Sequence, residues 1–161
     1  MNSKIAIVII IIKEEDYADY EIAINTTKCY AKHFGYQMHL IYAEKTVEIQ
    51  ENCKQNDIYF KRHCALAWFL EENKNTIDYA LYIDADMGVI NPCHTIQEYI
   101  DVDEKIEIIF YERYYNHEIA AGSYLLKNTQ TSRSFLLYWS NYKLPESFHG
   151  TDNGALHVSV L

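Results

Sequence analysis

The segment Tyr79-Ala80-Leu81-Tyr82-Ile83-Asp84-Ala85-Asp86 is a short apolar run that ends abruptly in two carboxylates. Its length and composition predict a buried strand at 79–83, with Asp84 at the point where that strand meets solvent. Residues two apart on an extended segment point the same way, so Asp84 and Asp86 can present their carboxylates to one point. Such oxygen ligands suit Mg²⁺ or Mn²⁺, which usually complete their shells with substrate phosphates and water.

The pattern on either side of this segment predicts strands that alternate with helices. The apolar stretches expected to form strands are 4–12, 36–43, 79–83, 105–111 and 123–126. Apolar residues recur at helical spacing in 17–33, 58–72 and 129–142, and Gly35 supplies a stop for the first of these helices. This alternation indicates an α/β fold with a largely parallel sheet, in which ligands bind outside the carboxyl ends of the strands. Asp84 stands at such an end.

Composition and charge narrow the class of protein. The 161 residues, 49% of them hydrophobic, can bury one core, so we expect a single domain over 1–161. A formal net charge of -9 and the lack of a Lys/Arg cluster argue against nucleic acid as a partner. The apolar run 5–12 is shorter than the roughly 20 residues that span a bilayer, and we predict no membrane segment in this chain.

The four cysteines do not predict a metal site. Cys29, Cys53, Cys64 and Cys93 form no CxxC pair and have no ligand-like spacing with the histidines, which argues against zinc. Four scattered cysteines are compatible with either redox compartment.

A DxD pair alone is a weak signal, because acidic pairs also occur in ordinary solvated turns. An EF-hand loop starting at Asp84 needs glycine at its sixth position and glutamate at its twelfth, where Val89 and Thr95 stand. A phosphatase of the haloacid dehalogenase type resembles DxDx(T/V) after a strand, but Gly88 occupies the Thr/Val position. The EF-hand interpretation therefore fails, and the phosphatase is the weaker alternative.

Three segments, in the same order along the chain, resemble a family of glycosyltransferases. They are 81–86 (LYIDAD), 121–128 (AGSYLLKN) and 150–156 (GTDNGAL). Together they are similar to the galactosyl, mannosyl and xylosyl transferases of fungal mannan and plant xyloglucan synthesis, and more so to a nematode-expanded family labelled as a domain of unknown function. The resemblance implies a GT-A nucleotide-diphospho-sugar transferase fold, with a Rossmann-like, mostly parallel sheet flanked by helices.

The resemblance also implies an activity and a donor site. It implies metal-dependent transfer of a hexose or pentose from a UDP- or GDP-sugar to a glycan or glycoconjugate acceptor, with retention at the anomeric carbon. Asp84 and Asp86 would hold Mn²⁺ or Mg²⁺ and the donor diphosphate, and Lys61 could reach the phosphates. These three positions are the first part of the implied site.

The second and third segments supply the rest of the implied site. Gly122 and Ser123 would let backbone approach the donor sugar. Asp152 would lie beside the anomeric carbon or hydrogen-bond the donor sugar, which makes it the one candidate catalytic residue. Asn153, next to it, would contribute to donor binding.

The chain departs from the relatives at several positions. Ala120 stands where they commonly have asparagine, and Thr151 replaces the first acid of its segment. They also supply a metal-binding histidine from beyond the segment with Asp152, so we expect an incomplete metal site or a C-terminally truncated chain, with His157 a poor substitute. A non-catalytic nucleotide-sugar or glycan-binding remnant is therefore the alternative function. The resemblance implies the Golgi and secretory-pathway lumen, where the relatives act from a membrane anchor near the N-terminus; no such segment is visible in this sequence.

Overall fold

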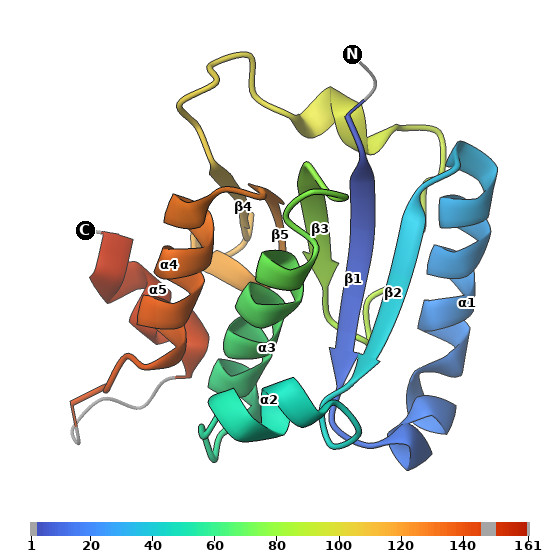
Figure 1. Cartoon of the computed structure of the whole chain (residues 1–161). Helices are drawn as coiled ribbons and strands as arrows, with labels where there is room; N and C mark the ends of the chain where they lie inside the picture. The colour runs from blue at the N-terminus through green and yellow to red at the C-terminus, as the bar shows by residue number, and fades with distance from the viewer. Residues whose placement is uncertain (1–2, 146–150, 161) are drawn as a thin grey trace.

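A five-stranded sheet with helices on both faces forms the centre of the computed structural model, which describes residues 3–145 and 151–160 (Figure 1). The strand order is β2-β1-β3-β5-β4. The strands are β1 (Ile5–Ile11), β2 (Gln37–Tyr42), β3 (Tyr79–Ile83), β4 (Ile108–Glu112) and β5 (Ile119–Lys127). β1 pairs in parallel with β2 and β3, whereas β5 is antiparallel to both β3 and β4. The predicted α/β fold is confirmed, and β5 is the one described strand that runs against the others.

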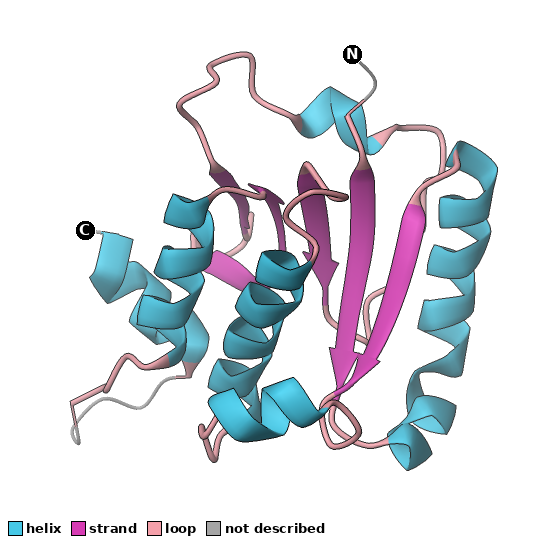
Figure 2. Ribbon diagram, viewed as in Figure 1, coloured by secondary structure: helices cyan, strands magenta, loops and turns pink. Residues whose placement is uncertain are grey.

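The helices cover the two faces of the sheet unequally (Figure 2). They are α1 (Tyr17–Phe34), α2 (Val47–Asn52), α3 (Ile58–Glu72), α4 (Gln130–Ser140) and α5 (Asp152–Val160), with 3-10 turns η1 (Glu14–Asp16) and η2 (Ile96–Tyr99). α1 packs on one face, while α3, α4 and α5 pack on the other. The sequence predicts α1, α3 and α4 but not α2 or α5. Gly150, from the third resembling segment, lies outside the described residues.

Local sequence explains where the main elements begin and end. All seven residues of β1 are buried, because helices cover both faces of this continuous apolar strand. α1 ends at Gly35, which adopts a left-handed φ of 73° and whose N–H donates to the Ala31 carbonyl. The Asp57 side chain caps α3 by accepting from the Tyr59 N–H, at 2.9 Å. The predicted stop at Gly35 is confirmed.

The start of β5 is the strand boundary that differs most from the prediction. The sequence predicts a strand over 123–126, yet β5 already begins at Ile119, which pairs with Glu112 of β4. The Asn153 side chain accepts from the Ala121 N–H at 2.7 Å, so this backbone is held from α5 as well as from β4. β5 thereby extends past the end of β3, whose last residue, Ile83, pairs with Ser123.

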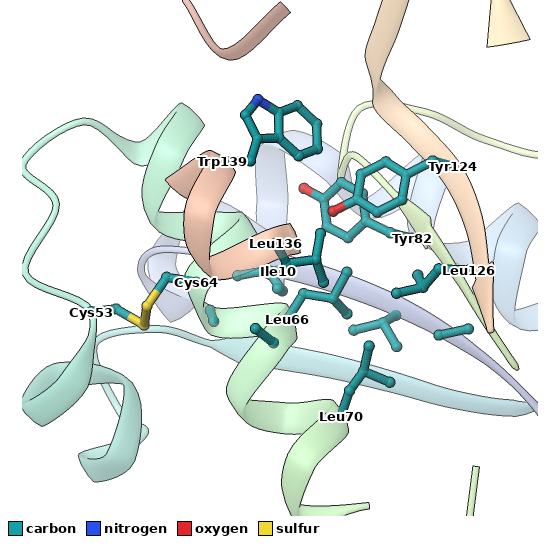
Figure 3. Close-up of a cluster of buried hydrophobic side chains, with 14 of the residues drawn as sticks. Ile10, Cys53, Cys64, Leu66, Leu70, Tyr82, Tyr124, Leu126, Leu136 and Trp139 are labelled. Atoms are coloured by element: carbon teal, nitrogen blue, oxygen red, sulfur yellow. A yellow bond between two sulfur atoms is a disulfide. The ribbon is translucent and has the colours of Figure 1, made fainter. Parts of the chain in front are cut away.

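The larger core lies between the sheet and the helices α3 and α4 (Figure 3). Trp139, Tyr82 and Tyr124 are its largest fully buried side chains. A disulfide joins Cys53, at the end of α2, to Cys64 in α3 across a sequence separation of 11 residues. The sequence does not predict this bond, because spacing alone does not pair cysteines. It ties down the first half of α3, while Cys29 and Cys93 are free and exposed.

No helix within the described ranges has the length and apolar character needed to cross a membrane.

Candidate active site

Asp84 and Asp86 line a cavity at the carboxyl end of β3. The cavity has a volume of about 200 Å³ and lies beside the ends of β1 and β3 and the first turns of α1 and α3. The arrowheads of these strands in Figure 1 point toward this edge of the sheet. Tyr20 from α1 and Tyr59 from α3 also line the cavity. It therefore combines two carboxylates with two aromatic side chains where open α/β sheets bind ligands.

The Asp84 carboxylate is held in place from three sides. Its Oδ1 atom accepts hydrogen bonds from the Tyr82 hydroxyl at 2.7 Å and from Arg62 Nη1 at 2.5 Å. Its backbone N–H donates to the Gly122 carbonyl at 2.8 Å, and its Oδ2 atom lies against Gly122. Asp86 is exposed at the rim. Asp84 is thus fixed, and Asp86 is accessible to a ligand.

Arg62 is a buried cation between two carboxylates that lie far apart in the sequence. Its Nη1 atom contacts Asp84, and its Nη2 atom contacts Asp152 Oδ2 at 2.6 Å. The Arg62 side chain is only 10% exposed, so little water screens these charges. The three side chains form one network that joins the end of β3, the start of α3 and the start of α5.

Asp152 lies behind Arg62 rather than at the surface of the cavity. It is 1% exposed, and its Oδ2 atom also contacts His63 Nε2 at 2.8 Å. Its Oδ1 atom accepts from the Asn153 N–H at 3.0 Å, and its carbonyl accepts from Trp139 Nε1. These contacts occupy the carboxylate and do not support direct contact with a sugar. They favour a role for Asp152 in positioning Arg62.

His63 is neutral in this network. Burial lowers its pKa to about 4, and the positive charge of Arg62 acts in the same direction, against the raising effect of Asp152. A carboxylate can only accept, so the His63 Nε2–H donates to Asp152, and Nδ1 accepts from the Tyr124 hydroxyl at 2.8 Å. The ring stacks on Trp139 with a centroid separation of 3.6 Å.

The two acids paired with Arg62 differ in their proton affinity. Burial raises the pKa of Asp84 and outweighs the opposing effects of Arg62 and Tyr82. Burial also acts to raise the pKa of Asp152, but the hydrogen bond from His63 and the charge of Arg62 prevail, so its pKa is lowered. Asp152 is therefore the firmly ionised partner of Arg62.

Position 122 requires glycine, because the Asp84 carboxylate leaves no room there for a side chain. A Cβ atom at this position would lie 2.8 Å from Asp84 Oδ2 and 3.0 Å from Met87 Cε. We expect Gly122→Ala to displace Asp84, to lower the free energy of unfolding by about 1–3 kcal/mol, and to weaken ligand binding in the cavity. Thermal unfolding and nucleotide titration of the variant check this, and unchanged values in both would contradict it.

The structure gathers some of the predicted residues and separates others. Asp84, Asp86 and Gly122 meet at the cavity edge. Asn153 instead links α5 to β5, and Ser123 is a partly exposed residue of β5 paired with Ile83. Lys61 is partly exposed and does not line the cavity, where its neighbour Arg62 does. Roles in donor binding for Lys61, Ser123 and Asn153 remain predictions.

Sequence reasoning missed Arg62 and His63 as site residues. A signal was present for Arg62, because Arg62, Leu66 and Leu70 are spaced by four and so share one face of a helix. Leu66 and Leu70 are fully buried, which places Arg62 on the inward side. No comparable signal exists for His63, whose partners Tyr124 and Asp152 are 61 and 89 residues away.

Residues 27–161 match the family described as “Protein of unknown function, DUF273”. The chain belongs to this family. No curated protein sequence matches the chain significantly. The description of the DUF273 family names no activity. The resemblance to the fungal and plant transferases therefore stays a prediction.

Solved structures show which fold this DUF273 chain shares. A glycosyltransferase involved in glycosylation of the major capsid of the virus PBCV-1 is 14% identical, with a TM-score of 0.69, and the match covers 98% of this chain and 76% of that one. The glycosyltransferase GlyE of Streptococcus pneumoniae is 14% identical, with a TM-score of 0.60 over 98% of this chain. The match spans only 43% of GlyE. At such identities the likeness establishes the fold, which is that of GT-A glycosyltransferases.

Proposed function

We propose that this chain binds a nucleotide-diphosphate sugar, UDP- or GDP-linked, and transfers its hexose or pentose to a glycan or glycoconjugate acceptor. The observation that carries the proposal is the cavity at the carboxyl end of β3, lined by Asp84, Asp86 and Arg62. Support also comes from the fold, which is shared with glycosyltransferases, and from the resemblance of the three sequence segments.

The nucleoside end of the donor fits the aromatic side of the cavity. Tyr20 and Tyr59 line it together with apolar side chains from the end of β1, such as Ile10 and Ile11. Tyr59 is 47% exposed, so its ring is available to a planar base. In this arrangement the diphosphate extends toward Asp86 and Arg62.

The carboxylates of Asp84 and Asp86 can hold Mn²⁺ or Mg²⁺ only if the substrate supplies further oxygen ligands. Asp84 Oδ2 and the Asp86 carboxylate are oxygen ligands, whereas Asp84 Oδ1 is already occupied by Tyr82 and Arg62. No group of three or more His, Cys, Asp or Glu side chains able to hold a metal occurs among residues 3–145 and 151–160. Two carboxylates suffice when phosphates and water complete the shell. Such a cation would offset the negative charge of the leaving diphosphate.

Arg62 supplies a second, fixed positive charge beside the same diphosphate. Its two terminal nitrogens are held by Asp84 and Asp152, and its Nε–H is buried without a hydrogen-bond partner in the described part of the chain. Because the carboxylates orient the guanidinium before the ligand arrives, it does not reorganise during the reaction.

We propose retention at the anomeric carbon, with the acceptor hydroxyl attacking on the face from which the diphosphate departs. The cavity-lining acids, Asp84 and Asp86, are assigned to the diphosphate, and Asp152 is buried behind Arg62. The departing phosphate oxygen, rather than a side chain, then takes the proton of the acceptor hydroxyl. The bond from the anomeric carbon to the diphosphate breaks, and the bond to the acceptor oxygen forms.

A non-catalytic nucleotide-sugar-binding protein is the second candidate. The specific observation in its favour is the burial of Asp152, the one acid that the sequence nominates for bond cleavage. A phosphatase is less favoured, because Asp84 is engaged by Arg62 and Tyr82 rather than free to attack phosphate.

We propose the Golgi or secretory-pathway lumen as the compartment. The Cys53–Cys64 disulfide supports it, since such bonds persist in oxidising compartments and are rare in the cytosol.

Release of nucleoside diphosphate from UDP- and GDP-sugars in the presence of Mn²⁺ tests the proposal. We expect slow hydrolysis of one donor by the wild type and a loss of at least tenfold in Asp86→Ala. Binding of a donor without any release of sugar would favour the non-catalytic candidate. Failure to bind either donor, with or without Mn²⁺, would contradict both.

A further inference from the structure

We propose that the turn between β4 and β5, residues 113–118, is a binding platform for the acceptor glycan, with Tyr114 and Tyr115 as the faces on which its sugar rings stack. This inference rests on the proposed function and names the residues that hold its second substrate.

The two tyrosines are exposed where a glycan can reach them. Tyr114 is 96% exposed and Tyr115 is 77% exposed, so neither contributes appreciably to the core. A tyrosine offers a flat apolar face and a hydroxyl at one end. A pyranose offers a patch of C–H groups on its face and hydroxyls around its edge. Stacking buries apolar area on both partners while each keeps its polar groups available for hydrogen bonds.

Hydrogen bonds and an ion pair hold the turn that carries these rings. The Arg113 N–H donates to the Glu118 carbonyl at 2.8 Å, and the His117 N–H donates to the Arg113 carbonyl at 2.8 Å. The side chains of Arg113 and Glu118 form an ion pair at 2.5 Å, and His117 takes a left-handed φ of 57° to close the turn. A preformed turn presents its rings with little loss of conformational entropy on binding.

A continuous set of contacts joins this turn to the donor cavity. Asn153 Nδ2 donates to Glu118 Oε1 at 3.3 Å, while Asn153 Oδ1 accepts from the Ala121 N–H at 2.7 Å. The next residue, Gly122, lies against the Asp84 carboxylate. Asn153 therefore holds the turn and the cavity edge at once, which fixes where the tyrosines stand relative to the donor.

The spacing along β5 indicates which part of an acceptor the tyrosines contact. Three residue steps separate Gly122 from Ile119, which is about 10 Å of strand, and the turn lies beyond. β5 runs antiparallel to β3, so this stretch extends past the end of β3 on the side of Asp84 and Asp86. That distance exceeds the length of one sugar ring and matches the length of a short oligosaccharide. The platform thus holds sugar rings of the acceptor that are distant from its reacting hydroxyl.

Binding to an array of oligosaccharides and their component monosaccharides tests the platform. Three proteins are compared: the wild type, the double variant Tyr114→Ala/Tyr115→Ala, and Tyr99→Ala. Tyr99 is the matched control, because it is 61% exposed and lies in η2, the yellow turn at the opposite end of the sheet in Figure 1. We expect wild type and Tyr99→Ala to bind oligosaccharides in preference to monosaccharides, and the double variant to lose at least tenfold in affinity.

The thermal shift produced by UDP or GDP with Mn²⁺ is measured on the same three proteins, and we expect it to be equal in all of them. Oligosaccharide binding that persists in the double variant overturns the platform, as does a wild type that binds nucleotide but no oligosaccharide. A wild type that gives no nucleotide shift contradicts the proposed function instead, so the two failures are distinguishable.

Discussion

Arg62→Met is expected to lower the free energy of unfolding by about 3–5 kcal/mol, because it leaves the partly buried carboxylate of Asp84 and the buried carboxylate of Asp152 without their shared cation. Methionine matches the arginine side chain only as far as Nε, so the substitution removes the guanidinium with its charge and its two hydrogen bonds. For a domain of this size the corresponding fall in the unfolding temperature is on the order of 10 °C. Thermal and urea unfolding measure it directly.

Lys61→Met is the matched control for this prediction. It removes the same charge from the adjacent position of α3, but Lys61 is partly exposed. Its free energy of unfolding should change by no more than about 0.5 kcal/mol. If both variants lost the same stability, the assignment of Arg62 as the buried cation would be wrong. Nucleotide titration of Lys61→Met tests separately whether Lys61 reaches the donor phosphates, as the sequence predicts.

The stability of the protein should fall as pH is lowered from about 6.5 to about 4. Burial lowers the pKa of His63 to about 4, so between these values the unfolded chain binds a proton that the folded protein does not. The unfolded state is then favoured as pH falls, and the full difference is worth about 3 kcal/mol. The raised pKa of Asp84 opposes this trend, while the lowered pKa of Asp152 adds a loss only at still lower pH.

His63→Gln isolates the contribution of His63 to this pH dependence. The variant is expected to be less stable at neutral pH, since it disturbs the contacts with Tyr124 and Asp152, but to show a flatter profile between about pH 4 and 6.5. His33→Gln, at an exposed position of α1, should keep the wild-type slope. An unchanged slope in His63→Gln would show that other groups cause the loss.

The parts of the fold that could be predicted from the sequence depend on local patterns. The continuous apolar run of β1, the short run of β3 and the left-handed Gly35 each follow from residues close together in the chain. The position of Asp84 at the end of a strand follows in the same way. Local sequence is therefore sufficient to place Asp84 and Asp86 at the carboxyl end of β3.

The parts that could not be predicted depend on contacts between distant segments. The resemblance of its segment predicts that Asp152 lies near the donor sugar. Its contact with Arg62 joins residues that are 90 positions apart in the chain, and only the fold brings them together. The Cys53–Cys64 pairing and the strand character of Ala120–Gly122 likewise depend on α3 and α5, which the local sequence does not specify. The sequence predicts Lys61 as the cation near the phosphates, whereas the next residue, Arg62, is the cation that lines the cavity.

Thermal unfolding with UDP or GDP, with and without Mn²⁺, is the most direct test of the donor site in wild type and Asp86→Ala. A ligand at about 100 times its dissociation constant adds about 2.7 kcal/mol, or on the order of 5 to 10 °C for a domain of this size. We expect such a shift with one of the nucleotides, a much smaller shift with Mn²⁺ alone, and no shift in Asp86→Ala. No shift under any condition, or an equal shift in Asp86→Ala, would contradict the donor site at Asp84 and Asp86.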